Sequence, residues 1–262
     1  MSTAVPLMRS EWVKLRSLRS TYVILGLAAL LGLGAGFLAI ASTVHSWPTL
    51  DATDRAALDP VADSFGGFEF AQLVLGALGV LVATGEYTTG TIGPTLAASP
   101  HRRHVYGAKL AVLAAVIVPT SLLFALVAFL LAQGQLAAVE MNTSLSQPHV
   151  LRSVACAGLY LASVSLIGFG VGAIFRHPAV ALTSMSVLVF LAWPIARAVE
   201  SYSYLPDRWL LVNAADALVG TRAPSAQNVP RTPSFSMACL ELGIYLGLTL
   251  GLGAWRAGRD AW

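Results

Sequence analysis

Charged residues are scarce in this chain. Only 11% of its 262 residues are Asp, Glu, Lys or Arg, while 56% are hydrophobic. A soluble domain usually carries about 25% charged residues. One globular core cannot hide an apolar surplus of this size, so lipid must cover much of it. The net charge of +3 does not indicate nucleic acid as a partner, because the basic residues flank apolar runs and do not form one patch.

Groups that would carry chemistry are also few. The two cysteines, Cys156 and Cys239, lie inside apolar runs, so a disulfide framework is not expected. The sequence has no phosphate-binding loop of the Walker A type, no H-E-x-x-H motif and no G-x-S-x-G motif. We therefore expect no catalytic residue, no metal site and no cofactor-binding residue in this chain.

Six long apolar runs are present instead. A membrane-spanning helix needs about 20 predominantly apolar residues, and a helix satisfies its own backbone hydrogen bonds in lipid. The first run has 23 residues, longer than the core of a signal peptide, so we expect it to be retained as a helix. The sequence predicts an all-α integral membrane protein, a single domain over residues 1–262, with spans at Thr21–Thr43, Phe65–Thr84, Leu110–Gln133, Arg152–Phe175, Ala179–Arg197 and Phe235–Trp255.

The basic residues gather on alternate sides of these runs. On the side of the N-terminus lie Arg9, Lys14, Arg16, Arg19, Arg102, Arg103, Lys109, Arg176, Arg256 and Arg259. On the other side lie Arg55, Arg152, Arg197, Arg208, Arg222 and Arg231. Cytoplasmic connections carry the excess of Lys and Arg. The distribution therefore predicts a multi-pass protein of the plasma membrane with both termini in the cytoplasm.

The first 20 residues mix apolar and basic side chains. Met8, Trp12, Leu15 and Leu18 recur at helical spacing between the bases. This pattern favours a cytoplasmic helix that lies in the membrane interface over residues 1–20, with its bases on anionic lipid. The alternative is a disordered basic tail that serves only to set the topology.

The one sizeable connection on the predicted cytoplasmic side is Gly85–Lys109. Glycine and proline interrupt it at Gly90, Gly93, Pro94 and Pro100, and these residues are typical of turns. We expect a short helix parallel to the membrane between the second and third spans, with one face toward the bundle and one toward a cytoplasmic partner.

The chain resembles the permeases of the ABC type 2 (ABC-2) transporter family and is similar to its actinobacterial members. The resemblance lies in Glu11–Ser17, in Thr84–Tyr87 with Gly90–Ile92, and in Thr95–Pro100 followed by Arg102 and Arg103. It implies that the cytoplasmic connection is a coupling helix, that a separate ABC ATPase subunit binds ATP and Mg²⁺, and that a second permease subunit, identical or similar, completes the transporter.

The resemblance also suggests which residues contact the ATPase. They are Glu86, Tyr87, Thr88, Thr89, Gly90, Thr91 and Ile92, flanked by Arg102 and Arg103. A simpler interpretation is that Glu86 caps a helix and that the two arginines only enforce the topology.

Two acids lie inside the predicted spans, both toward the outer face. Glu69 and Glu241 are costly there and are candidates for function, and Arg152 and Arg197 are near the same level. These four residues form either an outer gate that contacts a polar part of the substrate or structural ion pairs.

The sequence thus predicts a non-enzymatic permease subunit that exports a hydrophobic or amphipathic substrate, such as a drug, lipid or peptide. The alternative function is a membrane-embedded enzyme or a regulatory membrane anchor without transport. An enzyme should show clustered polar residues at mid-membrane depth, which the runs lack.

Overall fold

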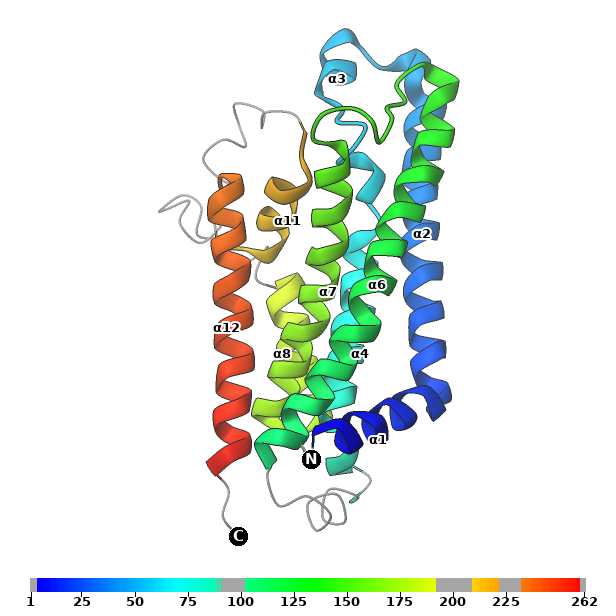
Figure 1. The fold of residues 1–262 in the computed structure, drawn as a ribbon. Helices are drawn as coiled ribbons and strands as arrows, with labels where there is room; N and C mark the ends of the chain where they lie inside the picture. Colours follow the sequence, from blue (N-terminus) through cyan, green and yellow to red (C-terminus); the bar gives the residue numbers. More distant parts are fainter. Residues whose placement is uncertain (1–3, 89, 91–101, 192–208, 222–231, 260–262) are drawn as a thin grey trace.

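The structure, a computed structural model, describes residues 4–88, 90, 102–191, 209–221 and 232–259. Every regular element in these residues is helical. Five helices are long and apolar enough to cross a membrane, and they run side by side in one bundle (Figure 1). They are α2 (Arg19–Ser46), α4 (Phe68–Thr88), α6 (Arg102–Leu136), α7 (Val150–Phe175) and α12 (Phe235–Arg259). The prediction of a helical integral membrane protein is confirmed.

The fifth predicted span is described only in part. It begins with α8 (Pro178–Ser186), where Pro178 occupies the first turn, a position that tolerates the missing N–H of proline. The π-helical segment η4 (Val187–Leu191) continues it. Pro178–Leu191 is a shorter apolar helix, and the remainder of the predicted span, up to Arg197, lies outside the described residues.

Helix α7 forms the centre of the bundle and packs against α4, α6, α8, α11 and α12. Its contact with α4 is close because glycines face backbone on both sides. A Cβ added at Gly79 would collide with the Ser165 carbonyl, and one added at Gly168 would collide with the Gly76 carbonyl. Small residues that let two backbones approach are the usual means of helix association in lipid. The bundle is therefore tightest where α4 crosses α7.

Short elements connect the helices at one end of the bundle. They are η1 (Trp47–Thr49), α3 (Ala52–Ala57), η2 (Asp63–Phe65), η3 (Ala137–Val139) and α11 (Leu211–Val219). Gln133 of α6 holds two of these connections together: its Nε2 donates to the Pro60 carbonyl (2.9 Å) and to Ser64 Oγ (3.0 Å), and its Oε1 accepts from the Thr143 N–H (2.7 Å). This end is called the distal end.

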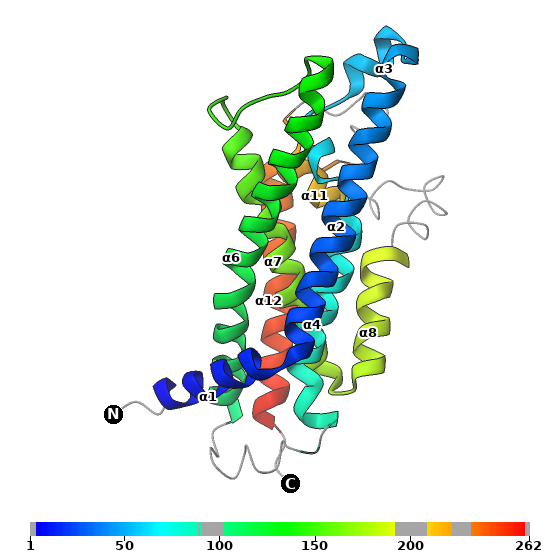
Figure 2. The ribbon, with the colours of Figure 1, turned by 90° about the vertical axis from the view of Figure 1, so that its right-hand side faces the viewer.

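At the opposite, basal end, α1 (Ala4–Ser17) lies across the bundle, transverse to the long helices (Figures 1 and 2). The chain turns from α1 into α2 at Leu18, whose backbone is extended (φ −76°, ψ 108°). The end of α12 also lies here (Figure 1). The structure has a helix where the sequence left a disordered tail as an alternative.

Candidate functional site

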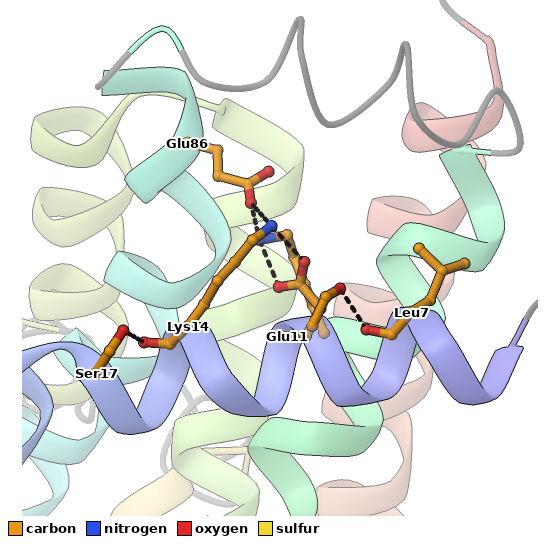
Figure 3. A network of polar contacts seen from close by, with 7 residues as sticks. Leu7, Glu11, Lys14, Ser17 and Glu86 are labelled. Carbon is orange, nitrogen blue, oxygen red and sulfur yellow. Dashed lines mark hydrogen bonds and ion pairs between the residues drawn. The ribbon is translucent and has the colours of Figure 1, made fainter.

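Four charged side chains from three helices meet at the basal end (Figure 3). Lys14 Nζ of α1 contacts Glu11 Oε1 and Glu86 Oε1, each at 2.7 Å. Lys109 Nζ of α6 contacts Glu11 Oε2 at 3.0 Å and Glu86 Oε1 at 2.9 Å. Each lysine therefore bridges the same two carboxylates, one from α1 and one from the last turn of α4. These four residues are called the basal ion network.

Most of the basal ion network is withdrawn from water. The exposed fractions are 6% for the Glu11 side chain and 12% for Glu86 and Lys109, against 43% for Lys14. Its formal charges cancel, which is the condition under which buried charges are tolerated. Burial alone would lower the pKa of the Lys14 ammonium, but the hydrogen bonds and charges of Glu11 and Glu86 outweigh burial and raise that pKa above its ordinary value. Lys14 is therefore a cation at any physiological pH.

The network fastens α1 to both helices that flank the predicted coupling segment. Glu86 is near the end of α4 and Lys109 is in the second turn of α6, while residues 89 and 91–101 lie between them. Gly90 is in a turn with φ +68°, a conformation that suits glycine. Of the predicted contact residues, Thr89, Thr91 and Ile92 lie outside the described residues.

The remaining predicted contact residues have different surroundings. Thr88 is exposed, and its hydroxyl donates to the Thr84 carbonyl of its own helix (3.0 Å). Tyr87 is exposed beneath the Arg176 guanidinium, 5.6 Å from its ring centroid. Arg102 begins α6, and the Arg103 guanidinium covers the space beside Gly258 of α12. Glu86 alone among them is turned into the bundle and engaged by lysines.

Arg176 joins three helix ends and was not singled out from the sequence. It follows the last residue of α7 with φ 57°, and its Nη2 donates to the Arg256 carbonyl of α12 at 2.9 Å. Its guanidinium also covers Tyr87 of α4. The signal for it was weak, because Arg176 is one of several bases between apolar runs. The sequence does not predict the basal ion network for a related reason: Lys14 and Lys109 stand among the bases that set the topology and Glu11 within the stretch that carries the family resemblance, and no pattern pairs them with Glu86.

The distal end holds a second polar region, a cavity of about 340 Å³. Glu69 lines it together with Gln72, Tyr160 and Asp216. The Tyr160 hydroxyl donates to Gln72 Oε1 at 2.6 Å. Burial and the charge of Glu69 raise the pKa of Asp216 to about 6, although the residue is partly open to water on the wall of the cavity.

The other three residues predicted near this level do not join the cavity. Glu241 is fully buried, and neither of its carboxylate oxygens has a hydrogen-bond partner within the described chain. Arg152 lies over the Phe235 ring at 4.7 Å, and no ion pair in the described ranges joins it to Glu69 or Glu241. Arg197 lies outside the described residues. No group of three or more His, Cys, Asp or Glu in the described part could hold a metal ion.

Comparison with known proteins identifies the family. A family model described as ABC-2 family transporter protein matches residues 7–192, which include most of α1, the basal ion network and the start of the fifth span. No curated protein matches the chain significantly. The long apolar helices and the family match together make this chain a multi-pass membrane protein and a non-enzymatic permease component of an ABC transporter. The chain belongs to the ABC-2 family of transporter proteins.

Proposed function

We propose that this permease exports a hydrophobic or amphipathic substrate and that a separate ATPase subunit, which holds ATP and Mg²⁺, supplies the energy. A second permease subunit, identical or similar, completes the path. The protein lies in the plasma membrane with its basal end, and both termini, in the cytoplasm. The distribution of basic residues supports this orientation.

The observation that carries the proposal is the basal ion network. Lys14, Lys109, Glu11 and Glu86 make four contacts of 2.7–3.0 Å among α1, α4 and α6. A partner that pushes the segment between α4 and α6 therefore moves α1 with it, since separating these charges would leave them buried and unpaired. Such a rigid joint suits the conversion of ATPase closure into a tilt of the spanning helices.

This arrangement divides the predicted contact residues into two roles. Glu86 transmits movement, because lysines of two other helices hold it. The exposed Tyr87 and Thr88, with residues 89–92 and the flanking Arg102 and Arg103, are the better candidates for contact with the ATPase. An enzyme or a passive membrane anchor would not need either role.

Two variants test the two roles separately. The tagged chain is expressed with the ATPase subunit of its own host, and co-purification, ATP hydrolysis and export are measured. Thr88→Arg adds a bulky charge to an exposed position whose hydroxyl bonds only its own helix, so we expect it to reduce co-purification of the ATPase. Lys109→Met should leave the ATPase bound but reduce export per ATP hydrolysed.

The matched control is Ser146→Arg, an exposed position at the distal end. It should change neither co-purification nor export. If no ATPase co-purifies with the wild type, or if Thr88→Arg and Ser146→Arg behave alike, the proposed coupling site is wrong. A protein that co-purifies with an ATPase but leaves its hydrolysis unchanged would favour the membrane anchor.

A further inference from the structure

A second cavity lies at the basal end, beside the ion network. Its volume is about 580 Å³, and it is an open cavity lined by residues of α1, α2, α4 and α6. One side is polar and is formed by the basal ion network with Ser17, Ser20 and Thr21. The other side is apolar, with Ile24 from α2, Leu78, Leu81 and Val82 from α4, Val112 from α6, and Leu15 and Leu18 at the corner between α1 and α2.

The change from polar to apolar follows the direction of the long helices. On α4, Glu86 lies at the polar side and Leu78 at the apolar side, eight residues apart, or about 12 Å at 1.5 Å per residue. On α2, Thr21 precedes Ile24 by nearly one turn. The cavity is therefore polar at the level of the network and apolar deeper along the bundle, as a phospholipid is from its headgroup to its chains.

The polar side offers donors to an anion. Lys14 is the most exposed member of the basal ion network, at 43%, so an ammonium is the charge that a ligand in the cavity reaches first. Thr21 is only 5% exposed and makes no side-chain hydrogen bond within the described chain, and it lines the cavity. Its hydroxyl can therefore donate to an acceptor of a ligand there. The hydroxyl of Ser20 is exposed beside it.

The start of α2 also favours an anion in the cavity. The helix is 28 residues long, and its N-cap residue Leu18 provides no side-chain hydrogen bond. The first N–H groups of a helix lack partners within the helix, and its dipole is positive there, so the first turn favours an anion. The Thr21 N–H is not one of the free donors of α2, because it donates to the Leu18 carbonyl at 3.1 Å. That first turn carries Ser20 and Thr21, which line the cavity. The exposed bases Arg16 and Arg19 flank it.

We propose that this cavity binds one glycerophospholipid from the adjacent leaflet, with its phosphate on Lys14, Ser20, Thr21 and the start of α2. An acyl chain then lies against Ile24, Leu78, Leu81 and Val82. The lipid fills the angle between α1 and α2, so it stabilises the position in which the basal ion network forms. The inference does not depend on the substrate or on the ATPase.

The test measures lipid binding directly. The full-length chain is purified in detergent and titrated with phosphatidylglycerol, and native mass spectrometry gives the affinity of the first bound lipid. We expect the double variant Ser20→Ala with Thr21→Val to weaken that affinity at least tenfold, because it removes two hydrogen bonds to a charged group. The matched control is Thr120→Val in α6, whose hydroxyl donates to the Val116 carbonyl of its own helix (2.7 Å).

A second arm tests the apolar side of the cavity. Leu81 is 38% exposed, so tryptophan at this position can be accommodated without disruption of the core, and Leu81→Trp should weaken lipid binding by filling the chain site. Millimolar glycerol 3-phosphate should not displace the lipid, since it lacks the chains. Helical content and elution volume are compared for all variants, so that a misfolded protein is recognised.

Two results would overturn the proposal. Equal lipid affinity in the double variant and in Thr120→Val would show that the start of α2 does not hold a phosphate. Displacement by glycerol 3-phosphate, with no effect of Leu81→Trp, would show a site for a free phosphate ion in place of a lipid. If the double variant misfolds, Lys14→Gln with the same readouts takes its place, and unchanged lipid affinity would again contradict the proposal.

Discussion

Replacing Lys109 by methionine removes one of the two cations on which the basal ion network depends. Lys109 Nζ is 3.0 Å from Glu11 Oε2 and 2.9 Å from Glu86 Oε1, and its side chain is only 12% exposed. Without it, two largely buried carboxylates share the single ammonium of Lys14. Loss of one partner from a buried pair costs about 3–5 kcal/mol. We expect the lower end, about 3 kcal/mol, because Lys14 still neutralises one carboxylate and Lys109 lines an open cavity that admits water.

The free energy of unfolding is measured by denaturant titration of the purified protein in mixed micelles. Arg9→Met is the matched control, since Arg9 is an exposed base of α1, and such changes usually stay within about 0.5 kcal/mol. The double variant Glu11→Gln with Lys109→Met restores the charge balance, so it should be more stable than Lys109→Met alone by about 1 kcal/mol. Two results would contradict this reasoning. One is that Lys109→Met lowers the free energy of unfolding no more than Arg9→Met does; the other is that adding Glu11→Gln to Lys109→Met lowers it further. Either result would mean that the network does not hold α1 to α4 and α6.

Three further predictions concern other parts of the bundle. Asp216→Asn should raise the Tm at pH 7.5, and this gain should disappear toward pH 4. The reason is that the pKa of Asp216 is raised to about 6, so its ionised form, present above that pH, destabilises the folded state. The control Glu140→Gln, at an exposed position, should show no such pH dependence. Gly168→Ala should lower the free energy of unfolding by about 2 kcal/mol, because the added Cβ would meet a backbone carbonyl of α4. Gly247→Ala, with open space around it, should leave the stability unchanged. Equal Tm values for the two variants would contradict the close contact of α4 and α7. Glu241→Gln should raise the Tm, because both carboxylate oxygens of this fully buried side chain lack partners within the described residues; unchanged export in the same variant would remove Glu241 from any outer gate.

The long apolar runs predicted the helices well but not their ends. The sequence predicts the first span at residues 21–43, and α2 covers Arg19–Ser46; it predicts the third span at residues 110–133, and α6 covers Arg102–Leu136. Hydropathy detects only the part of a helix that lipid surrounds. Arg102, Tyr106 and Gln135 are compatible with a helix but not with hydrocarbon, so the pattern ended before the helix did.

The site was harder to predict than the fold. Lys14 and Glu86 are 72 positions apart, and nothing in a single sequence pairs one lysine with one distant carboxylate. The helical spacing of Trp12 and Leu15 indicated α1, but not the extended residue Leu18 that turns it across the basal end. Once α1 lies there, the spacing of Glu11 and Lys14 brings both onto the side that faces α4 and α6.

The burial of the basal ion network decides how strongly dissolved salt affects the contacts of α1 with α4 and α6. Dissolved salt weakens attraction between exposed charges over a Debye length of about 8 Å at physiological ionic strength, but it reaches buried charges far less. Three of the four side chains are at most 12% exposed. The contacts that hold α1 to the ends of α4 and α6 therefore keep most of their strength when the ionic strength of the cytoplasm rises, and only the contacts of the more exposed Lys14 are open to competition from dissolved ions.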